Sequence, residues 1–156
     1  MAANEVPLGY WCTLVGQQYL ASLRGRLGSL GIDRWYFTLV RISEMEGPIT
    51  QQRLADELHL DKATMVRAID HLSACGYVAR RPCPHDRRKH HIELLPKALP
   101  AIKQVRQAFT ELNDQAFKGI PAAERKLLLA HLKEMLKRLG PAGHGEEGGK
   151  QKKTGR

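Results

Sequence analysis

The sequence predicts a mainly α protein with a small β-wing (α+β): a winged helix-turn-helix with N- and C-terminal helices that serve dimerisation. Three observations support this prediction. Residues 50–76 carry two short helical patterns separated by a tight turn. Two β-prone runs then bracket a loop rich in Arg and Lys. Before and after this centre, apolar residues recur at steps of three and four, which is typical of helices that pack on helices.

Two helices are expected before this centre, after a short frayed leader. The first covers residues 8–30 and carries one apolar stripe, made of Trp11, Val15, Tyr19, Leu23, Leu27 and Leu30. Gly31 is its predicted C-cap. Asp33 is the predicted N-cap of the second helix, which has a mostly apolar surface and ends before Gly47 and Pro48.

The two central helices begin at strong capping residues. Thr50 is the predicted N-cap of the first and Asp61 that of the second, which ends at Gly76. One apolar stripe of the second helix is predicted to pack inward, and it consists of Met65, Val66, Ile69 and Leu72. At about 100° per residue, the opposite side presents Thr64, Arg67 and His71, with Lys62 in the first turn.

This arrangement is what a helix that enters the major groove of DNA requires, since one face packs and the other offers hydrogen-bond donors. Taken alone, the two helices fit an ordinary helical hairpin with a solvated face equally well. The following segment favours DNA. Strands are expected over residues 77–81 and 90–95, with a hairpin tip at residues 82–89. One acid, Asp86, stands among five cations displayed to an anionic partner: Arg80, Arg81, Arg87, Arg88 and Lys89.

At this point the sequence resembles the MarR (multiple antibiotic resistance regulator) family of transcription factors. The matching motifs are LA-x-x-L at residues 54–58, L-x-x-x-G followed by two apolar residues and x-R at residues 72–80, and D-x-R at Asp86 and Arg88. The resemblance covers residues 8–139. It implies that Asp86 pairs with Arg88 to stiffen the wing, that a wing-tip Arg reaches the minor groove, and that terminal helices interleave in a homodimer. Relatives carry a Thr N-cap where this chain has residues 95–98, which leaves the start of the next helix open.

Two helical seams follow the wing. The first runs over residues 96–118 through Leu99, Ile102, Val105, Phe109, Leu112 and Ala116, with Pro100 inside the pattern. The second begins at Pro121, stops at Gly140, and carries Leu128, Leu132, Met135 and Leu139. We therefore expect a dimerisation region at residues 1–31 and 97–139, a DNA-binding lobe at residues 32–96, and a disordered basic tail at residues 140–156. The alternative is that the terminal helices cover only the core of their own chain.

Composition narrows the class of function. A chain of 156 residues with a formal net charge of +9 suits one compact domain with a polyanionic partner. Its three cysteines, Cys12, Cys75 and Cys83, fit a reducing cytoplasm, and there is no apolar run long enough to span a membrane. Enzyme motifs are absent, so we predict neither catalysis nor a cofactor. Cys83 with nearby histidines resembles a metal site, but the adjoining cations would repel a metal ion and no metal is expected.

Control of DNA binding is predicted mainly from the resemblance. MarR-type proteins often bind small aromatic or phenolic effectors beside the DNA-binding lobe, and the residues expected at such a pocket are Trp11, Trp35 and Tyr36. Plain core packing explains these three residues as well. Cys12 is a candidate redox residue, because peroxide-sensing relatives carry a reactive cysteine in this helix, although a buried structural cysteine is the favoured interpretation.

The sequence thus predicts a homodimeric, sequence-specific DNA-binding transcriptional regulator, a repressor that a small aromatic ligand releases from a pseudo-palindromic operator. Two alternatives remain open at this point. One is a redox- or metal-responsive regulator of the same fold. The other is a winged-helix module that docks on protein and not on DNA, against which the wing charge argues, because the centres of protein interfaces are depleted of Lys.

Overall fold

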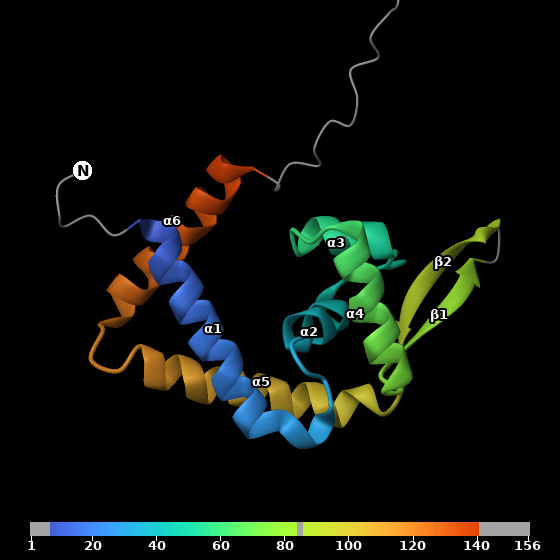
Figure 1. Cartoon of the computed structure of the whole chain (residues 1–156), viewed down its shortest axis with the longest axis horizontal. Helices are drawn as coiled ribbons and strands as arrows, with labels where there is room; N and C mark the ends of the chain where they lie inside the picture. Colours follow the sequence, from blue (N-terminus) through green and yellow to red (C-terminus); the bar gives the residue numbers. More distant parts are fainter. Residues whose placement is uncertain (1–6, 84–85, 141–156) are drawn as a thin grey trace, which may run out of the picture. The chain divides into compact units, whose positions relative to one another are not determined.

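The computed structural model describes residues 7–83 and 86–140, and it describes their side chains except those of residues 83–89 (Figure 1). The chain divides into two compact units, residues 1–120 and 121–156. The described elements run in the order α1 (Leu8–Leu27), a short 3-10 helix (Gly28–Leu30), α2 (Tyr36–Glu44), α3 (Gln51–Glu57), α4 (Lys62–Ala74), β1 (Val78–Cys83), β2 (Asp86–Leu94), α5 (Ala98–Ala116) and α6 (Ala122–Leu139). This order confirms the predicted fold class. Within the described ranges, no helix is both long enough and apolar enough to cross a membrane.

The predicted stripe of α1 is buried only in its second half. Leu23 and Leu27 lie in the core, where α1 packs on α5, whereas Trp11 and Val15 are 55% and 65% exposed. The helix gives way to the 3-10 turn at Gly28, and Gly31 follows in the left-handed conformation, with φ of 67°. Gly31 is therefore the predicted C-cap, at a backbone angle that side chains disfavour.

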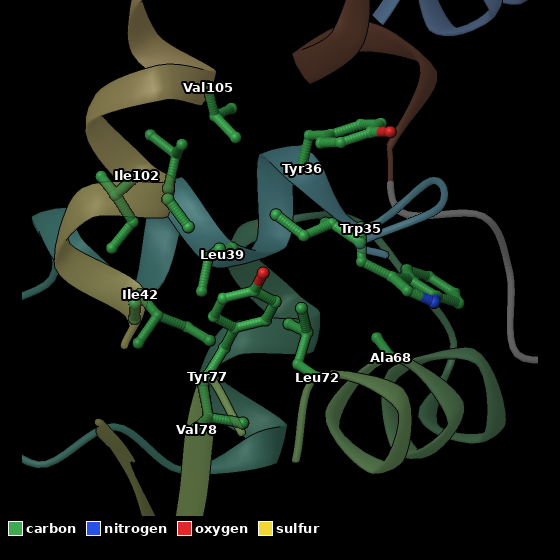
Figure 2. Packing of buried hydrophobic residues seen from close by; sticks show 14 of the residues in the cluster. Trp35, Tyr36, Leu39, Ile42, Ala68, Leu72, Tyr77, Val78, Ile102 and Val105 are labelled. Carbon is green, nitrogen blue, oxygen red and sulfur yellow. The ribbon is translucent and has the colours of Figure 1, made fainter. Parts of the chain in front are cut away.

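The predicted cap of α2 is wrong. Asp33 itself adopts a left-handed conformation, with φ of 56°, and α2 begins three residues later without a side-chain cap. Asp tolerates positive φ better than most residues, so it serves the turn and not the helix end. The turn brings the apolar side of α2 onto the core, where Tyr36, Leu39 and Ile42 are buried (Figure 2).

Both predicted caps of the central helices are confirmed. Thr50 Oγ1 accepts a hydrogen bond of 3.1 Å from the Arg53 N–H at the start of α3. Asp61 Oδ1 accepts one of 2.8 Å from the Thr64 N–H at the start of α4. Each bond satisfies a backbone donor that the first turn of a helix leaves unpaired, so the start of each helix is set by a local residue.

The wing strands are longer than the sequence predicted. β1 and β2 pair antiparallel from Val78 with Leu94 as far as Pro82 with His90, and the register shifts between Pro82 and Cys83. Strand pairing therefore enters the segment predicted as a hairpin tip, because a bulge in a two-stranded ribbon tolerates a proline. The base of the ribbon is anchored where the Ile92 N–H donates to the Ile49 carbonyl over 2.7 Å.

The start of α5, which the sequence left open, lies at Ala98. Pro100 falls in the first turn, where its missing N–H removes no helical hydrogen bond. Leu99 was predicted in the buried seam but is 64% exposed. Small residues take the inward positions beside the larger ones, and the buried face consists of Ala98, Ala101, Ile102, Val105, Ala108 and Leu112. The alanines allow α5 to approach the neighbouring helices closely.

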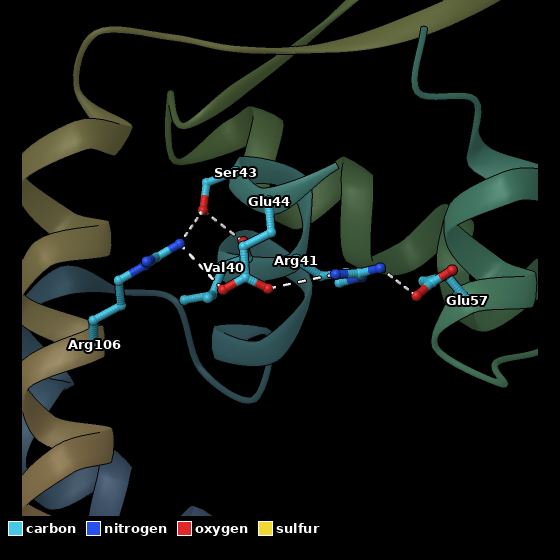
Figure 3. Close-up of polar contacts among 6 residues, drawn as sticks. All are labelled: Val40, Arg41, Ser43, Glu44, Glu57 and Arg106. Atoms are coloured by element: carbon cyan, nitrogen blue, oxygen red, sulfur yellow. Dashed lines mark hydrogen bonds and ion pairs between the residues drawn. The ribbon is translucent and has the colours of Figure 1, made fainter. Parts of the chain in front are cut away.

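A chain of polar contacts ties α2 to α5 and to α3 (Figure 3). Arg106 of α5 donates to Ser43 Oγ over 3.2 Å and to Glu44 Oε1 over 3.1 Å. Arg41 pairs with the other oxygen of Glu44 at 3.5 Å, and its guanidinium also bonds Glu57 of α3. Because these side chains are partly exposed, each pair contributes only about 0 to 1 kcal/mol to the stability of the fold. Together they link α2, α3 and α5.

Candidate nucleic-acid interface

The buried stripe of α4 differs from the predicted one at Val66. Met65, Ala68, Ile69 and Leu72 are buried, whereas Val66 is 37% exposed. Val66 lies about 110° around the helix from the middle of the buried stripe, so it cannot reach the core that Ala68 reaches. The exposed face of the first two turns consists of Lys62, Ala63, Val66 and Arg67. This is the part of a recognition helix that reaches base edges in helix-turn-helix proteins.

Arg67 is held by a relay of hydrogen bonds that begins at the helix cap. The Thr64 hydroxyl donates to Asp61 Oδ2 over 2.6 Å and accepts from Arg67 Nη2 over 3.0 Å. Bonds from the Thr64 hydroxyl and N–H hold the pKa of Asp61 below its ordinary value, so the carboxylate is charged at neutral pH. The relay orients the guanidinium before any ligand arrives. Thr64, predicted to approach the groove itself, already uses its hydroxyl within the chain.

Asp61 is a site residue that the sequence reasoning treated only as a cap. The signal that could have revealed its second role is the spacing of Asp61, Thr64 and Arg67, which are three residues apart and so lie on one side of the helix. Sequence alone does not show that the three side chains bond to one another.

His71 does not join the exposed face of Lys62 and Arg67. Its Nε2 lies 2.7 Å from the carbonyl oxygen of Gly31, and Cys75 Sγ donates to the same oxygen over 3.4 Å. The ring is half-buried between α4 and the turn that follows α1. His71 therefore ties α4 to the turn that follows α1.

The base of the wing carries less free charge than the sequence indicated. Arg80 donates to Gln51 Oε1 over 2.9 Å and pairs with Asp70 Oδ1 at 2.7 Å, which ties β1 to α3 and α4. Arg81 pairs with Glu93 across the ribbon at 2.9 Å. Each guanidinium thus has an acidic partner within the chain. The structure does not describe the side chains of the other predicted wing residues, which are Asp86, Arg87, Arg88 and Lys89. The expected pair of Asp86 with Arg88 therefore lies outside the described residues.

The three residues predicted for an effector pocket do not come together. Trp35 and Tyr36 lie in the core (Figure 2). Trp11 is exposed and packs edge-on against Tyr10, with ring centroids 5.3 Å apart. It stands sixteen residues before Leu27, a separation of roughly 24 Å along α1. Cys12 is a free and exposed thiol, so the favoured expectation of a buried cysteine is wrong within this chain.

A different aromatic group reaches the surface in the same unit. Phe37 of α2 stacks on Phe109 of α5 with centroids 5.1 Å apart, and Tyr19 of α1 lies 6.3 Å and 6.4 Å from the two rings. The Tyr19 hydroxyl donates to Asn113 Oδ1 over 3.0 Å, while Phe37 stays 45% exposed. Sequence reasoning missed this cluster because its members come from three helices far apart in the chain.

Comparisons with known proteins all find similarity to MarR family proteins. The family model described as "MarR family" matches residues 31–89, which run from Gly31 through β1 into β2. A solved MarR protein from Peptoclostridium difficile is 20% identical, with a TM-score of 0.80, and the match covers 89% of this chain and 91% of that one. A MarR transcriptional regulator from Methanosarcina mazei is 24% identical, with a TM-score of 0.74 and coverage of 84% and 94%.

A third similar structure contains nucleic acid. It is a MarR family transcriptional regulator from Listeria monocytogenes complexed with 26mer DNA, 20% identical, with a TM-score of 0.78 and coverage of 86% of this chain and 90% of that one. At these identities the likeness is one of fold. It extends over 84% to 89% of this chain in the three comparisons.

Proposed function

We propose, on the premise that this chain belongs to the MarR family, that it is a sequence-specific DNA-binding transcriptional regulator. It acts as a homodimer on a pseudo-palindromic operator, represses transcription there, and is released by a small aromatic or phenolic ligand. The proposal of DNA binding rests on Arg67, whose guanidinium is hydrogen-bonded to Thr64 on the exposed first half of α4. A guanidinium fixed in that position suits the two acceptors that guanine displays in the major groove.

The proposal of a homodimer rests on apolar side chains that each unit leaves uncovered. In α1 these are Leu8, Tyr10, Trp11, Leu14 and Val15, and in α6 they are Leu127, Leu128, Leu129, Leu132, Met135, Leu136 and Leu139. Exposed apolar groups of this extent mark an interaction surface. A second copy of the chain is the partner that would place two α4 helices about one turn of DNA apart, as a pseudo-palindrome requires.

The proposed effector site is the aromatic cluster of Tyr19, Phe37 and Phe109. Stacked rings with one exposed face and a nearby hydroxyl suit a small phenolic compound. The cluster joins α1, α2 and α5, so a ligand there would contact both the DNA-binding lobe and the helices proposed for dimerisation. An inducer must bind the free dimer more tightly than the DNA-bound one. Titrating a phenolic panel that includes salicylate against both forms tests this, and equal affinities would refute release.

Selection from a random duplex library tests the main proposal. The purified chain should enrich one motif with twofold symmetry and half-site centres about one helical turn apart. Placed in a promoter, that motif should lower the transcript of a reporter when the chain is expressed. Enrichment without symmetry would argue against the homodimer. Failure to enrich any motif would favour the protein-docking alternative.

A further inference from the structure

Val66 is an aliphatic side chain exposed on the face of α4 that the proposed function turns toward DNA. It lies one turn after Lys62 and next to Arg67, in the first half of the helix. Isolated exposed apolar residues are common on protein surfaces and need no special role. The position of Val66 separates it from these, because the first two turns of a recognition helix are where side chains meet base edges.

The polar groups beside Val66 limit which features of a base the exposed face of α4 can recognise. The Thr64 hydroxyl is already hydrogen-bonded to Asp61 and Arg67, and the Asp70 carboxylate forms an ion pair with Arg80. Between the cations Lys62 and Arg67, the surface that remains is formed by the methyl groups of Ala63 and Val66. In the major groove the base feature that an aliphatic group matches is the 5-methyl of thymine, because the other groups there are hydrogen-bond donors and acceptors.

We propose that Val66 is a specificity-determining residue that packs against the 5-methyl group of a thymine in each half-site of the operator. This inference rests on the proposed function. Valine suits the role because its branched side chain has one strongly preferred rotamer in a helix, so little freedom is lost when the contact forms. Ala63 is one methyl group on the backbone and reaches less far from the helix axis.

The test uses the duplex recovered by selection, with each thymine replaced singly by deoxyuridine, which lacks only the 5-methyl group. For the parent chain, the affinity should fall about fourfold at one thymine of each half-site, the effect of losing one buried methyl-sized group. Val66→Ala should bind deoxyuridine and thymine equally at that position. Arg67→Ala is the matched control, since it weakens binding but should keep the fourfold difference between the two bases.

The outcomes separate the two proposals. Val66→Ala should fold like the parent, because it removes exposed atoms and alanine favours the helix. If a motif is enriched but the deoxyuridine scan is the same for Val66→Ala and the parent, the inference about Val66 is overturned while DNA recognition stands. A selected motif that has no thymine at the positions facing α4 would also overturn the inference about Val66 and leave DNA recognition standing. If no motif is enriched, the proposed function and this inference fail together.

Discussion

The guanidinium of Arg67 donates to Thr64 Oγ1 over 3.0 Å, one helical turn back along α4. Thr64→Val removes this bond and the bond from the Thr64 hydroxyl to Asp61, but keeps the branched shape and the cap bond from the backbone N–H. We expect specific affinity to fall by about 0.5 to 1.5 kcal/mol, the net worth of one hydrogen bond, with non-specific affinity unchanged. Thr64→Ser, which keeps the hydroxyl, should restore binding. Equal titration curves for the valine variant and the parent would contradict a positioning role.

Arg67→Ala tests the residue that the relay positions. The variant should lose about 1 to 3 kcal/mol on the selected duplex and should relax base preference at one position of each half-site. The measurement is a titration against duplexes that carry every base at each position. A uniform loss across all of them would show that Arg67 contacts phosphate and does not read a base.

The ion pair of Arg81 with Glu93 predicts an asymmetric salt dependence. Glu93→Gln releases a cation at the base of the wing, so affinity for a scrambled duplex should rise and the salt slope should steepen by up to roughly one unit. Arg81→Gln should flatten the slope by less than that, because the parent pair is close to neutral. Identical slopes for all three proteins would place this pair away from the phosphates.

The uncovered apolar side chains of α1 predict a dimer that one charge can break. Val15→Asp puts a carboxylate on a side chain that is 65% exposed in the single chain but buried in the proposed dimer. Burying that charge without a partner costs several kcal/mol, so sedimentation should show a monomer. Val15→Thr keeps the branched shape at the same position without a charge and should leave the parent's dimer intact. A monomeric parent would refute the proposal directly.

The lowered pKa of Asp61 predicts how the helix cap responds to acid. Because the folded pKa lies below the unfolded value of about 3.9, the charged cap stabilises the fold above that value. The contribution is lost as the pH falls through the folded pKa. Asp61→Asn keeps a capping oxygen without the titration. Urea midpoints should therefore favour the parent near neutral pH and converge with those of the variant in acid, and a constant gap would exclude Asp61 as the cause.

Local sequence signals predict much of this fold. Thr50 and Asp61 cap the central helices as predicted, because a capping side chain bonds a backbone N–H only three residues away. Gly31 ends the first helical segment at a positive φ that few other residues adopt. Such signals act over a few residues, and so the order of helices and wing, and the family resemblance, were predictable from the sequence.

The sequence by itself therefore determined the order of the elements and the caps of the two central helices, because periodicity and capping depend on neighbours along the chain. The tertiary structure alone decided what individual side chains do. It exposes Val66 and buries Ala68, pairs Arg80 with Asp70, joins His71 to Gly31, and gathers Tyr19, Phe37 and Phe109 into one cluster. The physical reason is that these contacts join segments distant in sequence, and a side chain's environment is set by whichever segment packs against it.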